Sequence, residues 1–468
     1  MKVEQIYTGC LAHGAYYIHS NGEGVIIDPL REVEPYIKKA EKDGVKIKYI
    51  FETHFHADFV SGHLTLAEKT GAQIVFGPTA APDFDAHVAK DEEIFQLGNV
   101  KIKVLHTPGH TMESSTFLLL DENDSEHAIF TGDTLFLGDV GRPDLAQKAA
   151  NMTQEELAET LYDSLRNKLM PLPDSTIVYP GHGAGSACGK NMMKETVDTL
   201  GNQKKVNYAL RSDMTKAEFV EEVTDGLLPP PGYFPHNVMM NKKGYESIDE
   251  VLTEGTKPLS PEAFDAAANE TEAVILDVRK NTDFIEAHVP NSIFIGLDGG
   301  FAPWVGELII DVKTPILIVA AEDRVEEAVT RLSRIGFDNT LGYLEGGLEA
   351  WKDAGKDVEH LKSISAEEFA KIYPENKEKV FDVRKKSEYL AEHVEEANNV
   401  PLGFINNHLA EFNQDNMYIH CAGGYRSVIA ASILKSRGIH NLTDVRGGFK
   451  AIKATDVKTT DYVCPSTL

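Results

Sequence analysis

Long apolar runs, basic residues and cysteines are all scarce in this sequence. No segment approaches the roughly 18 consecutive apolar residues that a membrane-spanning helix needs, so we expect no membrane partner. The first residues contain no basic region followed by a long apolar core, so no secretory signal is expected. Only four cysteines occur in 468 residues, which excludes a disulfide-stapled scaffold and favours a reducing, cytoplasmic location.

Acidic residues outnumber basic residues by a wide margin. Lys and Arg number 46 against 73 Asp and Glu, which gives a formal net charge of −27. A surface of that sign repels phosphate backbones, so we expect no nucleic acid partner. Apolar residues make up 42% and charged residues 25%, as in ordinary globular domains. At about 150 residues per domain, the length predicts about three domains.

Short β-branched and aromatic segments alternate with helical stretches in the first half of the chain. Strands are predicted at residues 24–29, 46–54, 72–77 and 100–110. A helix predicted over 32–44 ends at a glycine, and the alternation predicts a layered α/β domain. Helical character over about 190–219 and a rigid, proline-rich strap over 227–245 follow. We therefore predict a first domain over residues 1–257.

The second half of the chain repeats itself. The segment 273–297 aligns with 379–402 at an offset of 105 residues, and a later glycine-containing segment aligns at an offset of 101. Each copy alternates strands and helices around a glycine-bounded loop, and units of about 100 residues are too long for a solenoid. We therefore predict two small α/β domains, over 258–356 and 357–468.

A cluster of potential metal ligands follows the predicted strand at 46–54. The sequence THFHADF contains His54, His56 and Asp58 within five residues, and these side chains can converge only if the backbone turns there. Further candidates each follow an apolar segment beside a glycine: His110, Asp133 and His182. Strand ends commonly assemble a functional site. We expect a metal site, while surface-loop histidines are the alternative in a chain with 17 of them.

These motifs resemble those of the metallo-β-lactamase superfamily over about residues 1–250. The resemblance rests on THxHxD followed by GHT, GDT and PGH, and it implies an αββα sandwich with a metal at one edge of the sheets. Hydrolytic members commonly carry a histidine directly after the aspartate of the first motif, which completes a second metal position. Phe59 stands there in this chain, and its apolar ring disfavours a two-metal centre.

The same motifs are similar to those of the persulfide dioxygenase branch of the superfamily. This resemblance implies that one Fe(II) per chain is held by His54, His110 and Asp133, and that the residues beside this set are His56, Asp58 and His182. Two histidines and one carboxylate leave coordination positions open for a persulfide sulfur and O2, as in non-haem Fe(II) oxygenases. Zinc on the same ligands would serve hydrolysis instead, and the sequence does not exclude it.

The segment GRPD, which follows Asp133, resembles a stretch shared by persulfide dioxygenases. Arg142 can pair with Asp144 to hold the wall of the site, or it can contact an anionic thiol carrier. The first of these roles is favoured.

In the last predicted domain, Cys421 ends an apolar strand and begins a glycine-containing loop. A helix is expected to start near Ser427, so that loop N–H groups, the helix dipole and Arg426 favour the nucleophilic thiolate. The loop resembles the C-x-x-G-x-R-S active loop of rhodaneses, which implies that Cys421 and Arg426 are catalytic. It also implies a persulfide-binding loop made of Ala422, Gly423, Gly424, Tyr425, Arg426 and Ser427. A buried structural cysteine is the alternative.

Two departures from the rhodanese pattern lie outside that loop. Glu392 and Glu396 replace glycines that are usual around His393, which puts the local loop geometry in question rather than the activity.

The middle copy lacks this chemistry. It contains no cysteine, and Glu322 and Asp323 would repel anions from the equivalent loop. We therefore expect a non-catalytic rhodanese homologue that positions the other two domains. The remaining thiols are weaker candidates: Cys10 as core, Cys188 as packing or as a sulfur relay near the metal, and Cys464 as incidental.

The complete pattern resembles bacterial multidomain persulfide dioxygenase–sulfurtransferases over nearly all 468 residues. It implies that a low-molecular-weight thiol persulfide is oxidised by O2 to sulfite and free thiol, and that a Cys421 persulfide converts sulfite into thiosulfate. The implied role is sulfide detoxification. One alternative is a zinc-dependent thioester hydrolase that resembles glyoxalase II, fused to a rhodanese domain; another is a scaffold whose sites are all degenerate. The thiol carrier does not follow from the sequence, and a homo-oligomer stays open.

Overall fold

The structure is a computed structural model that describes residues 1–464, and it divides into two compact units. The first contains Met1–Glu250 and Ser333–Gly336; the second contains Val251–Leu332 and the chain from Phe337 onward. None of the helices in the described residues has the length and hydropathy needed to span a lipid bilayer.

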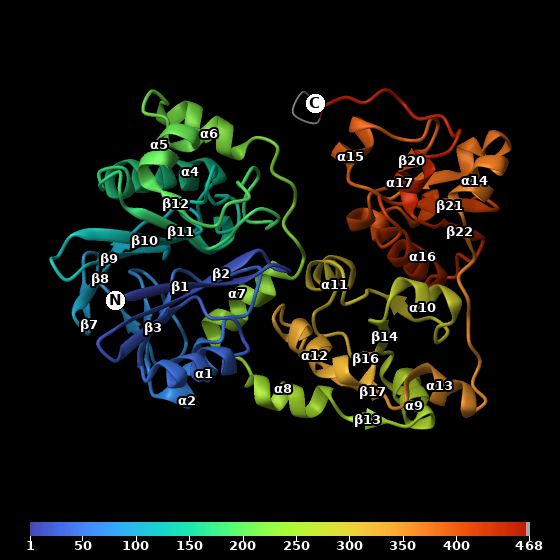
Figure 1. Cartoon of the computed structure of the whole chain (residues 1–468), viewed down its shortest axis with the longest axis horizontal. Helices are drawn as coiled ribbons and strands as arrows, with labels where there is room; N and C mark the ends of the chain where they lie inside the picture. Colours follow the sequence, from blue (N-terminus) through green and yellow to red (C-terminus); the bar gives the residue numbers. More distant parts are fainter. Residues whose placement is uncertain (465–468) are drawn as a thin grey trace. The chain divides into compact units, whose positions relative to one another are not determined.

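Two six-stranded sheets form the centre of the first unit (Figure 1). The first sheet runs in chain order through β1 (Lys2–Thr8), β2 (His13–Ser20), β3 (Glu23–Ile27), β4 (Lys46–Glu52), β5 (Gln73–Phe76) and β6 (His87–Val88). The second runs through β7 (Ile94–Leu97), β8 (Val100–His106), β9 (Ser115–Leu120), β10 (Glu126–Gly132), β11 (Ile177–Pro180) and β12 (Asp198–Thr199). Apolar side chains of both sheets, such as Phe51 and Phe117, pack together in one buried cluster.

Helices cover the outer faces of the two sheets, because each sheet is apolar on both sides. Leu66 and Tyr36 pack on the first sheet from α2 (His63–Thr70) and α1 (Glu34–Asp43). Leu161, Leu200 and Phe219 pack on the second sheet. They belong to α4 (Gln154–Ser164), α5 (Leu200–Val206) and α6 (Lys216–Thr224). The predicted αββα sandwich is confirmed.

Two local predictions were wrong in part. The stretch 190–219 is not continuously helical, because turns and the short β12 precede α5. The segment 227–245 contains a helix, α7 (Phe234–Lys243), rather than an extended strap throughout. Pro235 lies in the first turn of α7, where a proline removes no hydrogen bond and its fixed φ suits a helix. The chain up to this point also contains α3 (Gln147–Ala150), a π-helical turn at Leu165–Leu169 and a 3-10 turn at Tyr208–Leu210, and α8 (Ile248–Gly255) follows α7.

The second unit contains two five-stranded parallel sheets with the same strand order. The first is ordered β13 (Pro258–Leu259), β17 (Thr340–Leu344), β16 (Ile316–Val319), β14 (Val274–Asp277) and β15 (Ile293–Phe294). The second is ordered β18 (Ser363–Ile364), β22 (Leu442–Val445), β21 (Met417–His420), β19 (Val380–Asp382) and β20 (Asn398–Asn399). The predicted duplication is therefore confirmed at the level of topology.

The helices of the two copies also correspond. The middle copy has α9 (Pro261–Thr271), α10 (Asn281–Glu286), α11 (Phe301–Leu308), α12 (Val325–Ser333) and α13 (Gly347–Asp353). The last copy has α14 (Ala366–Ile372), α15 (Lys386–Ala391), α16 (Arg426–Ser436) and α17 (Gly448–Ile452). Short 3-10 turns, including Leu402–Asn407, stand in the last copy where the middle copy has α11.

Candidate functional site

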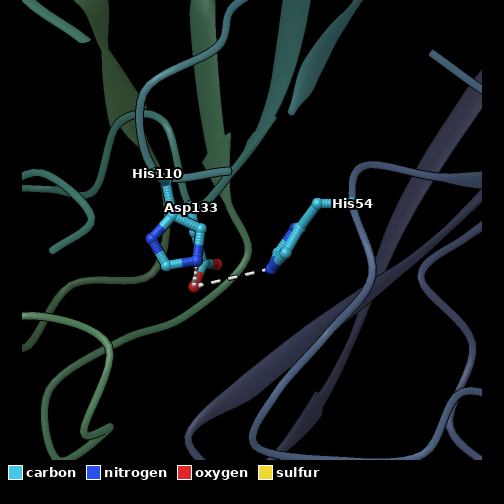
Figure 2. A group of neighbouring side chains, drawn as sticks. All are labelled: His54, His110 and Asp133. Carbon is cyan, nitrogen blue, oxygen red and sulfur yellow. Dashed lines mark ion pairs between the residues drawn. The ribbon is translucent and has the colours of Figure 1, made fainter. Parts of the chain in front are cut away.

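Three loops that follow strands bring His54, His110 and Asp133 together (Figure 2). His54 follows β4 of the first sheet, whereas His110 and Asp133 follow β8 and β10 of the second. The Asp133 Oδ2 atom lies 3.9 Å from His54 Nε2 and 3.5 Å from His110 Nε2. Ligand atoms that share one ion at about 2.1 Å are themselves about 3–4 Å apart. The spacing therefore fits a single metal ion.

Hydrogen bonds determine which nitrogen of each histidine is free. Thr53 Oγ1 donates to Asp28 Oδ2 at 2.8 Å, so its oxygen accepts the N–H of His54 Nδ1 at 3.0 Å. His110 Nδ1 donates to the carbonyl oxygen of Arg142 at 2.9 Å. Both Nε2 atoms therefore keep a lone pair on the side of the carboxylate, which is the tautomer that binds a metal.

The electrostatics of this group also match a cation. Both carboxylate oxygens of Asp133 are buried without a hydrogen bond. Burial, with the neighbouring Asp58, raises the pKa of Asp133 well above its usual value, and burial lowers the pKa of His110 to about 4. A divalent cation compensates the buried carboxylate charge and requires neutral imidazoles. The residues present thus fit a metal ion.

Gly132 allows the end of β10 to approach the loop that carries His54. Its φ is +50°, and a Cβ atom there would lie 2.5 Å from Thr53 Oγ1. Only glycine meets both conditions without displacing the threonine that orients His54.

Of the residues predicted beside the ligands, His56 lies against two other carboxylates, whereas Asp58 and His182 lie against each other. His56 Nε2 lies 3.1 Å from Asp28 Oδ1 and 3.5 Å from Glu52 Oε2. Burial acts to lower the pKa of His56, but these carboxylates outweigh it and raise the pKa well above its usual value. Asp58 Oδ2 lies 3.3 Å from Nε2 of His182, whose pKa is lowered by burial to about 3. His56, Asp58 and His182 still have potential ligand atoms within 4.8 Å of one another.

Phe59 is fully buried and packs against one member of this group, His56, and against His13. Its ring centroid is 4.3 Å from those of both His13 and His56. Carbon therefore occupies the space where the resemblance to hydrolytic enzymes would place another imidazole ligand.

Four buried ionisable residues around the centre were missed from the sequence. His13 Nε2 donates to the Asp28 carbonyl oxygen at 2.8 Å. Glu52 Oε1 lies 3.4 Å from His63 Nδ1. Burial acts to raise the pKa of Glu52, but His56 and His63 outweigh it and lower the pKa to about 2. Asp28 directly follows the apolar strand β3 and Glu52 is the last residue of β4, and a carboxylate at the end of an apolar strand is the signal that could have identified them.

The predicted pair between Arg142 and Asp144 is confirmed. Arg142 Nε and Nη2 donate to the two oxygens of Asp144, each at 2.7 Å. The same guanidinium donates to the carbonyl oxygens of Ala187 and Leu228. These contacts fix the backbone carbonyl that orients His110.

The thiol of Cys421 lies in a buried position between β21 and α16. Its sulfur accepts a hydrogen bond from the N–H of Gly424 at 3.1 Å, and Gly424 has a φ of +97°. Arg426 does not donate to the sulfur. Its guanidinium forms two hydrogen bonds to the Glu388 carboxylate, at 2.6 and 2.9 Å, so the hydrogen bond to the sulfur comes from the loop backbone and Arg426 acts on the thiol through its charge alone.

The equivalent loop of the middle copy has a different shape. Ala320 stands in the position of Cys421, and residues Glu322–Arg324 form a 3-10 turn. Arg324 pairs with Asp298 at 2.7 Å and with Glu327 at 2.8 Å. This copy therefore has neither the thiol nor the glycine-lined loop.

The three remaining cysteines differ in their burial. Cys188 is buried, and its sulfur lies within 4.8 Å of ligand atoms of Asp133 and His182. Burial raises the pKa of the Cys188 thiol well above its usual value. Cys10 is half-buried rather than in the core, and Cys464 is exposed.

Comparisons with known proteins agree with the two-part architecture. The metallo-beta-lactamase superfamily matches residues 8–182, and the rhodanese-like domain matches residues 260–354 and 365–455. A solved metallo-beta-lactamase from Staphylococcus aureus is 30% identical, with a TM-score of 0.63, and the match covers 74% of this chain and 98% of that one.

Two kinds of curated relative match the first half of the chain. A probable hydroxyacylglutathione hydrolase of Schizosaccharomyces pombe is 36% identical over 34% of this chain, but the match spans only 59% of its own length. The human mitochondrial persulfide dioxygenase ETHE1 is 30% identical over 47% of this chain and 79% of its own length. The chain therefore belongs to the metallo-beta-lactamase superfamily, and its second half consists of two rhodanese-like domains.

Proposed function

We propose that the first unit is a mononuclear Fe(II) persulfide dioxygenase, and that Cys421 is the sulfur-accepting thiol of a coupled sulfurtransferase. The overall oxidation converts RSSH, O2 and H2O into RSH, sulfite and two protons. The outer sulfur loses four electrons and O2 gains four. The likeness to a persulfide dioxygenase over most of that relative's length supports this reaction class.

The observation that carries the proposal is the position of Phe59. Its buried ring lies against His13 and His56, where a second metal would need an imidazole. His54, His110 and Asp133 then remain as a two-histidine, one-carboxylate set for a single ion. When bound, Fe(II) on such a set supplies open positions for both O2 and sulfur.

The residues of this chain orient and insulate that centre. Thr53 and the Arg142 carbonyl hold the two imidazoles in the ligand tautomer. All three proposed ligands are buried, which limits competing water. Burial acts to lower the pKa of His56, but Asp28 and Glu52 raise it well above its usual value, so the cationic form of His56 offsets part of their buried negative charge.

The proposed sulfur transfer uses the other unit. Attack of Cys421 on the outer sulfur of RSSH breaks its S–S bond, forms a Cys421 persulfide and releases RSH. Sulfite then attacks the outer sulfur of that persulfide, which forms thiosulfate and restores the Cys421 thiol. The Gly424 N–H can donate to the sulfur in either state. The net role would be sulfide detoxification in the cytoplasm.

A zinc hydrolase acting on thioesters is the second candidate, and two observations favour it. The match to a probable hydroxyacylglutathione hydrolase has the higher identity, and His56, Asp58 and His182 remain close enough to be considered as a second ligand group. That reading leaves the Cys421 loop without an obvious task.

Metal content and O2 uptake distinguish these candidates. We expect purified chain to bind one iron per chain and to consume O2 with glutathione, coenzyme A, bacillithiol or cysteine persulfide, releasing sulfite. Protein that carries zinc, consumes no O2 and cleaves a glutathione thioester would overturn the proposal in favour of the hydrolase.

The role of Phe59 can be tested separately by metal stoichiometry. Phe59→His restores an imidazole and should raise the bound metal from about one toward two ions per chain, whereas Phe59→Leu should leave it at one. Two ions in the unsubstituted protein would contradict the mononuclear centre.

A further inference from the structure

We propose that the non-catalytic rhodanese copy positions the Cys421 loop through Asn281, Gly296 and Gly299. This inference rests on the proposed role of Cys421 as the sulfur acceptor. It assigns a specific task to a domain that has no thiol of its own, and it involves residues of the second unit alone.

The first contact is a hydrogen bond to the glycine that serves the thiol. Asn281, the first residue of α10, donates from Nδ2 to the Gly424 carbonyl oxygen at 3.1 Å. The N–H of the same Gly424 donates to Cys421 Sγ at 3.1 Å. The peptide that Asn281 holds therefore follows directly on the one that faces the sulfur, and both share the Gly424 Cα atom, so the hydrogen bond from Asn281 restrains the position of the residue whose N–H serves the thiol.

The second contact fixes the next residue of the loop. Tyr425 donates its hydroxyl to the Gly296 carbonyl oxygen at 2.6 Å, and its ring lies edge-on to that of Phe294 at 5.7 Å. Gly299 leaves room for the ring, because a Cβ atom there would lie 2.2 Å from the Tyr425 Cζ atom. The φ of Gly299 lies outside the left-handed region, so its lack of a side chain is needed for contact rather than for backbone conformation.

Within the last copy, backbone N–H groups of Phe449 and Lys450 donate to the carbonyl oxygens of Cys421 and Ala422 at the start of the loop. At its end, the Ile429 N–H donates to the Tyr425 carbonyl oxygen, and Glu388 holds the Arg426 side chain. Between them Gly423 is exposed, the Gly424 carbonyl accepts from the middle copy, and the Tyr425 side chain donates to it. In the middle copy itself, Arg324 stands in the position of Tyr425 and pairs with its own domain. The glycine-rich run 296–300 thus serves the thiol of the other copy.

The direction of the Gly424 N–H matters for the chemistry of Cys421. A thiolate or persulfide at Cys421 is stabilised only while the Gly424 N–H points at sulfur. Loss of one such anchor is worth about 1 kcal/mol, which corresponds to roughly a five- to tenfold change in rate. Asn281 is therefore a positioning residue, not a catalytic one.

The test uses the full chain and two readouts. Alkylation of Cys421 by iodoacetamide, quantified by mass spectrometry of its peptide, needs no sulfur donor. Formation of thiosulfate from glutathione persulfide and sulfite gives kcat and KM. We expect Asn281→Ala to slow alkylation and to lower kcat by about five- to tenfold, with KM for sulfite unchanged. Asn269→Ala, an exposed position on α9, is the matched control and should change neither.

A double-mutant cycle separates positioning from general damage to the middle copy. Gly299→Ala should slow alkylation about tenfold in the unsubstituted chain, because the new methyl group meets the Tyr425 ring. In a Tyr425→Ala background the same change should have no further effect. Tyr425→Phe, which removes only the hydroxyl donor, should slow alkylation by about two- to threefold.

Three outcomes decide the matter. Unchanged alkylation and kcat in Asn281→Ala would overturn the inference, as would an equal effect of Gly299→Ala in both backgrounds. A chain that forms no thiosulfate, yet loses alkylation rate in Asn281→Ala, would support the positioning role while refuting the proposed sulfur transfer.

Discussion

The two rhodanese copies share a buried frame and differ in one loop. In the middle copy Arg279 pairs with Asp277 at 2.6 Å, and in the last copy Arg384 pairs with Asp382 at 2.5 Å. Both arginines also donate to a carbonyl oxygen eight residues further along the chain. This aspartate–arginine pair and the carbonyl contact of the arginine, together called the frame, have the same geometry in the copy with a thiol and in the copy without one. The frame therefore serves the fold.

The histidine after each frame motif behaves in the same way. His288 stacks on Phe284 at a centroid distance of 3.9 Å, and His393 stacks on Tyr389 at 3.7 Å. By contrast, the loop after the central strand has a thiol and glycines in one copy, and an acidic 3-10 turn in the other. The comparison shows that the two copies share their packing and differ in the loop that carries the thiol.

The largest expected effect comes from removing the thiol. Cys421→Ser should abolish thiosulfate formation, because a hydroxyl cannot hold a sulfane sulfur, while sulfite formation by the first unit continues. Product analysis with a persulfide and O2 measures both. Ala320→Ser, the equivalent change in the middle copy, should alter neither product. Thiosulfate formed at the normal rate by Cys421→Ser would remove the functional difference between the copies.

Breaking the shared frame should have the next largest effect. Arg384→Ala leaves Asp382 buried without its partner and removes a cation–π contact with Phe449, so we expect a loss of about 3–5 kcal/mol in unfolding free energy of the last copy. Chemical denaturation, followed by protection of Cys421 from alkylation, reports on that copy.

Arg279→Ala tests whether the frame contributes as much to the stability of the middle copy. Both tryptophans of the chain, Trp304 and Trp351, lie there, so tryptophan fluorescence follows its unfolding. We expect a smaller loss than for Arg384→Ala, because Arg279 is the more exposed arginine. Arg446→Ala, on an exposed side chain, should cost less than about 0.5 kcal/mol. Equal stability of Arg384→Ala and Arg446→Ala would contradict a structural frame.

The two copies should also differ in how their stability depends on pH, and this effect should be smaller than that of breaking the frame. Asp444 is buried below the Cys421 loop, and burial outweighs its hydrogen bonds from Ser427 and Ser363 and raises its pKa to about 6. Since the unfolded value is near 3.9, this group's stabilising contribution is complete below about pH 4 and is lost as pH rises through about 6. Asp444→Asn should therefore flatten the stability profile in that window and gain on the order of 1–2 kcal/mol at pH 7.

Thermal unfolding between pH 4 and 8 measures this effect. The middle copy has Tyr343 in the equivalent position, so its own transition should lack the feature. Asp415→Asn, at an exposed position, is the control. A profile for Asp444→Asn that parallels the unsubstituted chain would show that burial of this carboxyl has no energetic consequence.

The smallest expected effect concerns a turn that the two copies share. Glu396 and Asn291 occupy equivalent positions and both have a φ of +62°. Glu396→Gly should stabilise the last copy by about 0.5–1 kcal/mol, because glycine adopts this conformation without steric cost. Asn291→Gly should gain less, since asparagine tolerates the left-handed region better. The midpoints of urea unfolding measure the stabilisation by each substitution. A larger gain from Asn291→Gly than from Glu396→Gly would contradict this expectation.

Much of the site could be anticipated because its residues lie at the ends of strands. An apolar strand followed by a polar residue and a glycine is a local pattern, and it identified His54, His110, Asp133 and Cys421 as neighbours of strand ends. The departure at Glu396 was also visible as a missing glycine, and the structure shows that the glycine-like conformation is retained there.

The partners that orient these residues could not be anticipated, because they are distant in sequence. The Arg142 carbonyl that fixes His110, the Glu388 carboxylate that holds Arg426 and the amide of Asn281 beside Gly424 meet their targets only after the sheets have assembled. None of these pairs has a recognisable spacing. The helix α7 was missed for a related reason, since a proline in the first turn of a helix looks like one in an extended segment.

By itself, the sequence determined the sandwich, the duplication and the residue types available for chemistry, because alternation of apolar residues and glycine positions act over a few residues. Only the tertiary structure decided which histidine nitrogens face the carboxylate, that Phe59 fills the space between His13 and His56, and that the copy without a thiol holds the loop of the copy that has one. Hydrogen bonds and ring packing of this kind depend on distances of a few ångströms between segments that the fold alone brings together.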